Sequence, residues 1–121
     1  HGLRYTTFYY SDMSLRPVGD GSVECTLKLA NTRKRAGAGV VQIYVKPLNP
    51  SVNRPVHELK AFEKVWLKSG ESREVKFILG RDAFSFYDVT LGDWKYDKCR
   101  YLIEAGSSTR NIHLGQEINL D

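Results

Sequence analysis

The sequence predicts an all-β domain, folded as a two-sheet sandwich of about seven strands. Three observations predict it. Apolar and polar residues alternate at every second position over several short segments, which is the pattern of a half-buried strand. Turn residues recur roughly every ten residues along the chain. No segment has the periodicity of an amphipathic helix. Together these features are typical of an immunoglobulin-type sandwich.

The length of 121 residues indicates a single domain, 1–121, that can bury a core without metals or obligatory disulfides. A composition of 41% hydrophobic and 26% charged residues is that of an ordinary globular domain and argues against disorder. No apolar run is long enough for a membrane helix, so we expect no membrane contact. The start His1-Gly2-Leu3-Arg4 is neither an initiator methionine nor a signal peptide, and we interpret the chain as a piece of a longer one.

The first half of the chain contains three expected strands. The segment 5–10 is rich in aromatic and β-branched residues and is predicted as the first. A turn region ending at Gly19-Asp20-Gly21 follows. Regular alternation predicts a second strand over 23–29, and Val40–Val45 forms the third. Three prolines, Pro47, Pro50 and Pro55, then forbid regular pairing and predict a loop of the kind that often meets partners.

The longest predicted strand lies within residues 55–71, where apolar residues alternate with glutamates and lysines. Leu59, Val65 and Leu67 are its expected inward positions. The alternation falters at Ala61-Phe62, so we expect a bulge there that carries Phe62 to the inner face. The turn Ser69-Gly70-Glu71 is expected to make a hairpin with the strand that follows.

The second half is predicted to contain the remaining strands and one short helical turn. That turn is expected at 80–83. The strands are expected around residues 75–79, 84–88, 94–96, 101–105 and 112–114.

Cysteines and basic residues give no sign of a metal or nucleic-acid site. Cys25 and Cys99 lie in predicted strands and lack Cys-x-x-Cys spacing, so they are either buried free thiols or a disulfide across the sandwich. The net charge of +4 is modest, and Arg33-Lys34-Arg35 is predicted to be a solvated hairpin tip. No nucleic-acid-binding module is recognisable. His1, His57 and His113 do not form a ligand-spaced set, so we expect neither metal nor cofactor.

Tyr101 has two open interpretations. It is either the tyrosine whose hydroxyl fixes the corner before the penultimate strand or a plain core aromatic.

Several segments, taken in order, resemble the C-terminal fibronectin type III-like domain of glycoside hydrolase family 3 enzymes, which include β-glucosidases and β-xylosidases. The resemblance covers nearly the whole chain, with 11–22 and 89–97 fitting loosely. The segments are His1–Phe8, Asn31-Thr32, Val40–Val45, Arg54-Pro55, Glu58–Lys60, Gly70-Glu71, Ser85–Asp88 and Gly106–Ser108.

The resemblance implies a non-catalytic accessory domain that packs against the catalytic domains of the same chain. It also implies that the parent is a retaining β-glycosidase acting outside the cytoplasm, extracellular or periplasmic. Retaining glycosidases need two carboxylates about 5 Å apart, and in this family both come from preceding domains. Gly92-Asp93-Trp94 is similar to the family's nucleophile motif, but its position predicts a turn. We therefore expect no catalytic residue in this chain.

The candidate contact residues are Trp66, Tyr44 and Arg54. Trp66 and Tyr44 have outward parity on their strands, and Arg54 lies in the proline-rich loop. These side chains either pack on neighbouring domains or offer an aromatic platform to a polysaccharide or lignin. The alternative function is therefore a polymer-binding module that anchors the parent enzyme.

Overall fold

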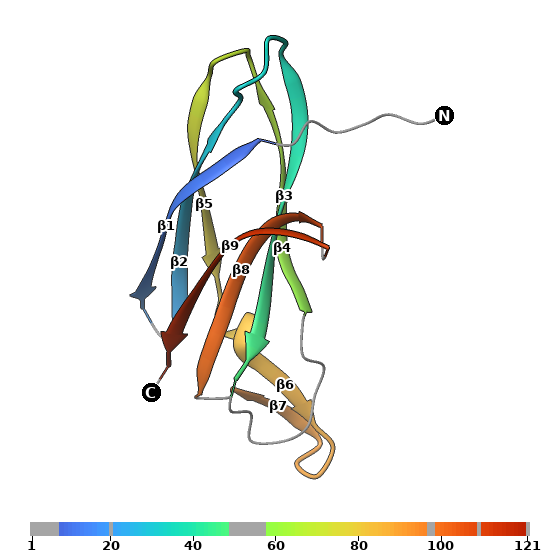
Figure 1. Ribbon diagram of the computed structural model, residues 1–121. Helices are drawn as coiled ribbons and strands as arrows, with labels where there is room; N and C mark the ends of the chain where they lie inside the picture. Colours follow the sequence, from blue (N-terminus) through green and yellow to red (C-terminus); the bar gives the residue numbers. More distant parts are fainter. Residues whose placement is uncertain (1–7, 20, 49–57, 97–98, 109, 121) are drawn as a thin grey trace, which may run out of the picture.

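The computed structural model describes residues 8–19, 21–48, 58–96, 99–108 and 110–120. Within these ranges the chain forms nine strands, and seven of them make two facing antiparallel layers (Figure 1). The all-β sandwich predicted from the sequence is confirmed. One sheet has the order β1-β2-β5, from β1 (Tyr9–Val18), β2 (Ser22–Ala30) and β5 (Ser72–Leu79). The other has the order β4-β3-β8-β9, from β4 (Glu58–Leu67), β3 (Gly37–Pro47), β8 (Arg100–Ser108) and β9 (Asn111–Asn119).

Strands β6 (Ser85–Asp88) and β7 (Asp93–Tyr96) form a separate two-stranded ribbon at one end of the sandwich (Figure 1). The expected helical turn is confirmed as the 3₁₀ helix η1 (Arg81–Phe84), which leads directly into β6.

The core lies between the two layers. Strands β2, β3, β5 and β8 supply about every second side chain to it, because successive side chains in a strand point to opposite faces. The described core residues with no exposed surface come from both sheets and from η1: Val23, Cys25, Leu27 and Leu29 from β2, Val41 and Ile43 from β3, Leu67 from β4, Tyr101, Ile103 and Ala105 from β8, and Phe84 from η1.

In the described residues the first strand begins at Tyr9 and continues through the segment predicted as a turn. β1 pairs with β2 from Tyr9 to Val18, with one extra residue between Ser11 and Ser14. Asp12 has a φ of 56° there, in the left-handed region. Because β1 is an edge strand, it tolerates both this bulge and Pro17, which is why its sequence does not look like a strand. Residues 5–7 of the expected strand lie outside the described part.

The prediction of a hairpin at Ser69-Gly70-Glu71 is wrong. The turn exists, with Gly70 at a φ of 77° and the Glu71 N–H bonded to the Lys68 carbonyl at 3.0 Å. However, β4 pairs with β3 and β5 pairs with β2, so this turn carries the chain from one sheet to the other. Alternation shows that a strand has a buried face but not which strand lies beside it.

A second connection between the sheets runs alongside this turn. The loop from β2 to β3 contains Arg33-Lys34-Arg35, all exposed, so the basic segment is a solvated loop but not the tip of a hairpin. Asn31 joins the two connections although it is almost fully buried. Its amide nitrogen donates to the carbonyls of Leu67 at 3.1 Å and Arg35 at 2.9 Å, and its amide oxygen accepts from the Arg33 N–H at 3.0 Å.

Tyr101 has the corner role rather than a purely packing one. Its buried hydroxyl donates to the Phe84 carbonyl at 3.0 Å, and its ring lies edge-on to that of Phe84, with centroids 4.9 Å apart. This contact ties η1 to the start of β8.

Both cysteines are buried free thiols, so the disulfide alternative is not realised. Burial raises the pKa of the Cys25 thiol to about 12. Across the described ranges, no helix is long and apolar enough to cross a membrane.

Candidate interaction surface

The outer face of the four-stranded sheet is shaped by a bulge in β4. Ile43 lies opposite Ala61 and Tyr44 lies opposite Leu59, so Lys60 is the extra residue. The expected bulge is therefore present, one position earlier than the apolar pair suggested. The extra residue shifts the alternation by one, so the side chains that precede it in β4 point to the face opposite to the one that the sequence pattern predicts. Leu59 consequently points outward with Tyr44, whereas the sequence placed it inward.

Phe62 also points outward, and the expectation that the bulge would turn it into the core is wrong. It lies opposite Gln42 on the outer face and is 67% exposed. Trp66, four residues further on, has the outward position predicted for it and is 58% exposed. With Leu59, which is 47% exposed, these side chains expose apolar surface along the outer face of β4, and Lys64 lies between Phe62 and Trp66. We call Leu59, Phe62 and Trp66 the β4 row.

Tyr44 lies on the same face but does not offer a ring to solvent. It is only 4% exposed, and Leu59 and Glu104 lie opposite it on the two neighbouring strands. Its hydroxyl donates to the side-chain oxygen of Gln42. We expected Tyr44 to offer a solvent-facing platform. This expectation is corrected, because the ring is buried beside Leu59. Arg54, the third candidate, lies outside the described residues.

The outer face of the three-stranded sheet has a different chemistry. Glu24 on β2 receives a hydrogen bond from Arg16 on β1 and forms an ion pair with Lys76 on β5 at 3.2 Å. These hydrogen bonds, with the charges of the two cations, hold the pKa of the Glu24 carboxyl below its ordinary value. Charged side chains thus span all three strands of this face, as on a solvated surface.

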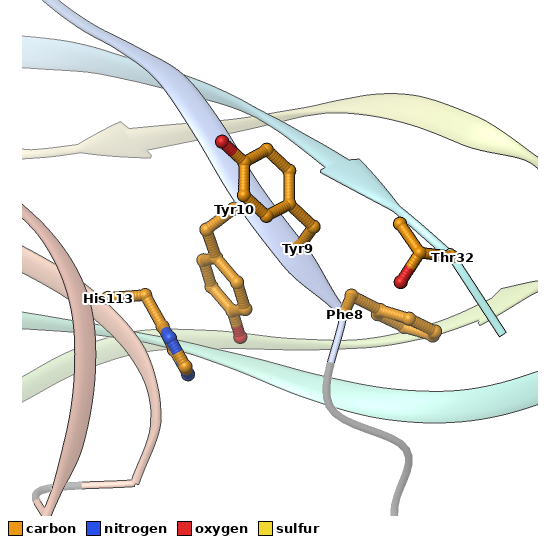
Figure 2. A pocket seen from close by; sticks show the side chains of 5 residues that line it. All are labelled: Phe8, Tyr9, Tyr10, Thr32 and His113. Carbon is orange, nitrogen blue, oxygen red and sulfur yellow. The ribbon is translucent and has the colours of Figure 1, made fainter.

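A shallow hollow of about 390 Å³ lies where β1 approaches β9 (Figure 2). It is lined by Phe8, Tyr9, Tyr10, Thr32 and His113. The rings of Tyr10 and His113 stack with centroids 4.5 Å apart, and the Tyr10 hydroxyl lies 3.5 Å from the Val40 carbonyl oxygen. Burial raises the pKa of the Tyr10 phenol to about 12, so it stays neutral in ordinary buffers. This contact joins β1 of one sheet to β9 of the other.

Among the described residues, no three or more histidine, cysteine, aspartate and glutamate side chains gather into a group that could hold a metal ion. Two carboxyls there have clearly shifted pKa values, and both shifts are downward. The pKa of Glu71 is lowered because its carboxylate accepts the Lys68 N–H at 2.7 Å in the turn after β4. Asp93, from the motif that resembles a glycosidase nucleophile, begins β7 after Gly92, in the predicted turn region.

A family model for the fibronectin type III-like domain matches residues 39–109, which include the β4 row and Tyr101. The chain belongs to the fibronectin type III-like domain family. Its relatives include β-glucosidases and exo-α-(1→6)-L-arabinopyranosidases. Thermostable β-glucosidase B of Acetivibrio thermocellus is 42% identical over the whole chain, and the periplasmic β-glucosidase of Salmonella typhimurium is 41% identical over 80% of it.

The solved structures that resemble this domain include β-glucosidases, as the sequence relatives do. The glycoside hydrolase family 3 β-glucosidase of Bifidobacterium adolescentis matches the entire fibronectin type III-like domain with a TM-score of 0.92 and 37% identity. The domain spans only 16% and 13% of the two sequence relatives and 18% of that solved chain. It is therefore a domain of the type found within family 3 β-glucosidases, and most of each relative lies outside the matched segment.

Proposed function

We propose that this fibronectin type III-like domain is a non-catalytic accessory domain of a family 3 glycoside hydrolase. In this proposal it packs against the catalytic domains of its own chain and stabilises them. The observation that carries the proposal is the match of the whole domain to 16–18% of β-glucosidase chains. The parent is then a retaining β-glycosidase of the β-glucosidase or β-xylosidase type, and its reactive carboxylates belong to other domains.

The β4 row is the surface proposed to contact the catalytic domains. Leu59, Phe62 and Trp66 expose large apolar side chains on one strand, and a buried Tyr44 lies beside Leu59. Exposed apolar patches of this kind mark protein contacts, and tryptophan is enriched among the residues that dominate such interfaces. The Arg16–Glu24–Lys76 face of the other sheet has the charges of a surface that stays in water.

The pKa values of the Glu24 and Glu71 carboxyls support a structural role for these two residues. A glycosidase general acid needs a carboxyl whose pKa is raised so that it carries a proton near neutral pH. Glu24 and Glu71 are shifted the other way, because each is a carboxylate held by hydrogen bonds within the fold.

The proposed location of the parent enzyme is outside the cytoplasm, extracellular or periplasmic. It is supported by the periplasmic β-glucosidase of Salmonella typhimurium, a relative that is 41% identical.

The proposal is tested in the full-length parent enzyme with the double variant Phe62→Ser/Trp66→Ser. Ile78→Ser is the matched control, because Ile78 is an equally exposed apolar residue on the opposite sheet. We expect the double variant to lower the apparent melting temperature by about 2–6 °C and the control to change it by less than about 1 °C. Activity on a nitrophenyl β-glucoside should decay faster on heating only in the double variant.

Two results would count against this assignment. One is a double variant with the same melting temperature and activity as the control. The other is retention of the parent on cellulose, xylan or lignin that disappears with Trp66→Ser while stability is unchanged, which would make the row a polymer-binding surface.

A further inference from the structure

The β6–β7 ribbon is a second surface, separate from the β4 row. Its two strands pair with each other from Ser85–Tyr96 to Asp88–Asp93 and join neither sheet of the described chain. Figure 1 shows it extending beyond the end of the sandwich, with its turn pointing away from both layers. A lone two-stranded ribbon is marginally stable in water, so one that extends from a domain usually needs further contacts.

The tip of this ribbon is apolar. Val89 is 85% exposed and Leu91 is 64% exposed, both in the turn between the strands. Behind them Tyr87 and Trp94 lie opposite each other and pack edge to face, with centroids 5.7 Å apart, while both remain at least half exposed. Turn residues are ordinarily polar. Four large apolar side chains at a tip therefore indicate a surface that is covered in the working protein.

The turn is held in shape by its own hydrogen bonds. The Asp88 carboxylate accepts the N–H groups of Thr90 at 2.9 Å and Leu91 at 3.3 Å, and the Gly92 N–H donates to the Asp88 carbonyl at 2.8 Å. Gly92 has a φ of 68°, which favours glycine. Because the tip is formed before it meets a partner, little conformational entropy is lost on docking.

The charges around the tip favour a partner other than a second ribbon. Asp88 and Asp93 lie directly opposite each other where the ribbon meets its turn. Two ribbons meeting about a two-fold axis would bring four carboxylates together, which is unfavourable. A head-to-tail contact with another copy would not close and would give open chains of molecules. An apolar tip with a pair of carboxylates at its base instead fits an apolar depression with a lysine or arginine at its edge.

We propose that the β6–β7 tip is an intramolecular docking arm that inserts into an apolar, basic-edged depression on another domain of the same polypeptide. The inference rests on the proposed function, because a relative such as the Acetivibrio thermocellus enzyme carries the matched segment as only 16% of its length. A tethered partner is present at high effective concentration, so a small tip suffices to hold it. The arm and the β4 row then fix the domain at two separate places.

The test uses the full-length enzyme and limited proteolysis by chymotrypsin, which cleaves after exposed aromatic residues such as Tyr87 and Trp94. The variant is Val89→Ser/Leu91→Ser, because these side chains pack little within the domain and both Asp88 and Gly92 remain to form the turn. Ile78→Ser is the control for loss of an exposed apolar side chain. We expect cleavage in the ribbon to be about tenfold faster in the double variant than in the control and in the wild type.

The outcomes separate this inference from the proposed function. Equal cleavage rates in all three proteins would overturn the docking arm, and they leave the Phe62→Ser/Trp66→Ser result to judge the proposed function. Light scattering on the same samples addresses a second copy as the partner. If the wild type is an oligomer and Val89→Ser/Leu91→Ser is a monomer, the tip binds another copy and the intramolecular inference is wrong.

Discussion

One hydroxyl group fixes the corner before β8. Tyr101 is fully buried, and its hydroxyl satisfies the Phe84 carbonyl across 17 residues of sequence. Removing that donor leaves a buried carbonyl unpaired, which costs more than a solvent-exposed hydrogen bond. The ring itself still fills the core, because phenylalanine has nearly the same shape.

Tyr101→Phe should therefore lower the free energy of unfolding by about 1–3 kcal/mol. Urea unfolding followed by fluorescence measures it. Tyr96→Phe is the matched control, because the Tyr96 hydroxyl lies 3.5 Å from the Gly21 carbonyl at a half-buried position and should contribute less than about 0.5 kcal/mol. Equal decreases in the free energy of unfolding of the two variants would show that the buried Tyr101 hydrogen bond contributes no more than that of the half-buried Tyr96.

Glu24 makes stability depend on pH in the acid range. Its pKa is lower in the folded chain than its ordinary value of 4.5, so the folded state favours the carboxylate. That stabilisation is fully present above the ordinary pKa and is lost as the pH falls through the lowered one. Since Arg16 and Lys76 are exposed, the effect should be small and should weaken with salt.

The expected result is that wild type exceeds Glu24→Gln in stability by a constant amount above about pH 5.5 and that the gap narrows as the pH falls below the ordinary pKa of 4.5. Urea unfolding across this range, in low and high salt, gives the gap directly. Glu74→Gln on β5 controls for the loss of one negative charge. A gap that stays constant down to pH 3 would contradict the ion-pair account.

At the scale of elements, the two connections between the sheets decide how the strands are arranged. Both the β2–β3 loop and the β4–β5 turn cross from one layer to the other, and Asn31 bonds to backbone groups in each. The Asn31 N–H also donates to the Glu71 carbonyl at 2.9 Å, and the Gly70 N–H donates to the Asn31 carbonyl at 2.8 Å. One buried residue thus joins the crossovers that put β4 and β5 into different sheets.

Asn31→Ala should destabilise the domain by roughly 2–4 kcal/mol, because it removes three side-chain hydrogen bonds and leaves buried backbone groups unpaired. Asn31→Asp keeps the acceptor for the Arg33 N–H but loses both donors, so it should lie close to the alanine variant. Ser69→Ala removes one exposed bond to the Arg33 carbonyl and should cost less than about 1 kcal/mol. Thermal and urea unfolding compare the set, and an alanine variant within about 0.5 kcal/mol of wild type would refute this role.

The β4 bulge shows how one element controls the surface. A single extra residue, Lys60, places Leu59 on the same outer face as Phe62 and Trp66. Without it, the start of β4 would send Leu59 into the core and leave only two residues in the row. The apolar surface therefore depends on the backbone register as well as on side-chain identity.

At the scale of the whole molecule, the two outer faces of the sandwich differ. One has the Arg16–Glu24–Lys76 cluster, and the other has the β4 row with Tyr44 beside it. The β6–β7 tip adds a second apolar surface at one end (Figure 1). This asymmetry is what a domain with one face in water and another against a partner should have.

By itself the sequence determined the fold class, most of the strands and the outward position of Trp66. Alternation at every second residue and the placement of turn residues are local features, so they can be recognised from neighbouring residues in the sequence. The turn helix at η1 and the exposure of the basic loop follow from the same kind of pattern.

Only the tertiary structure decided strand partners and the exact position of the bulge. Those choices assigned β4 and β5 to different sheets, turned Leu59 and Phe62 outward, buried Tyr44 and gave Tyr101 its partner at Phe84. The physical reason is that pairing between strands joins residues far apart in the chain, and a shift of one residue in that pairing exchanges the inner face for the outer.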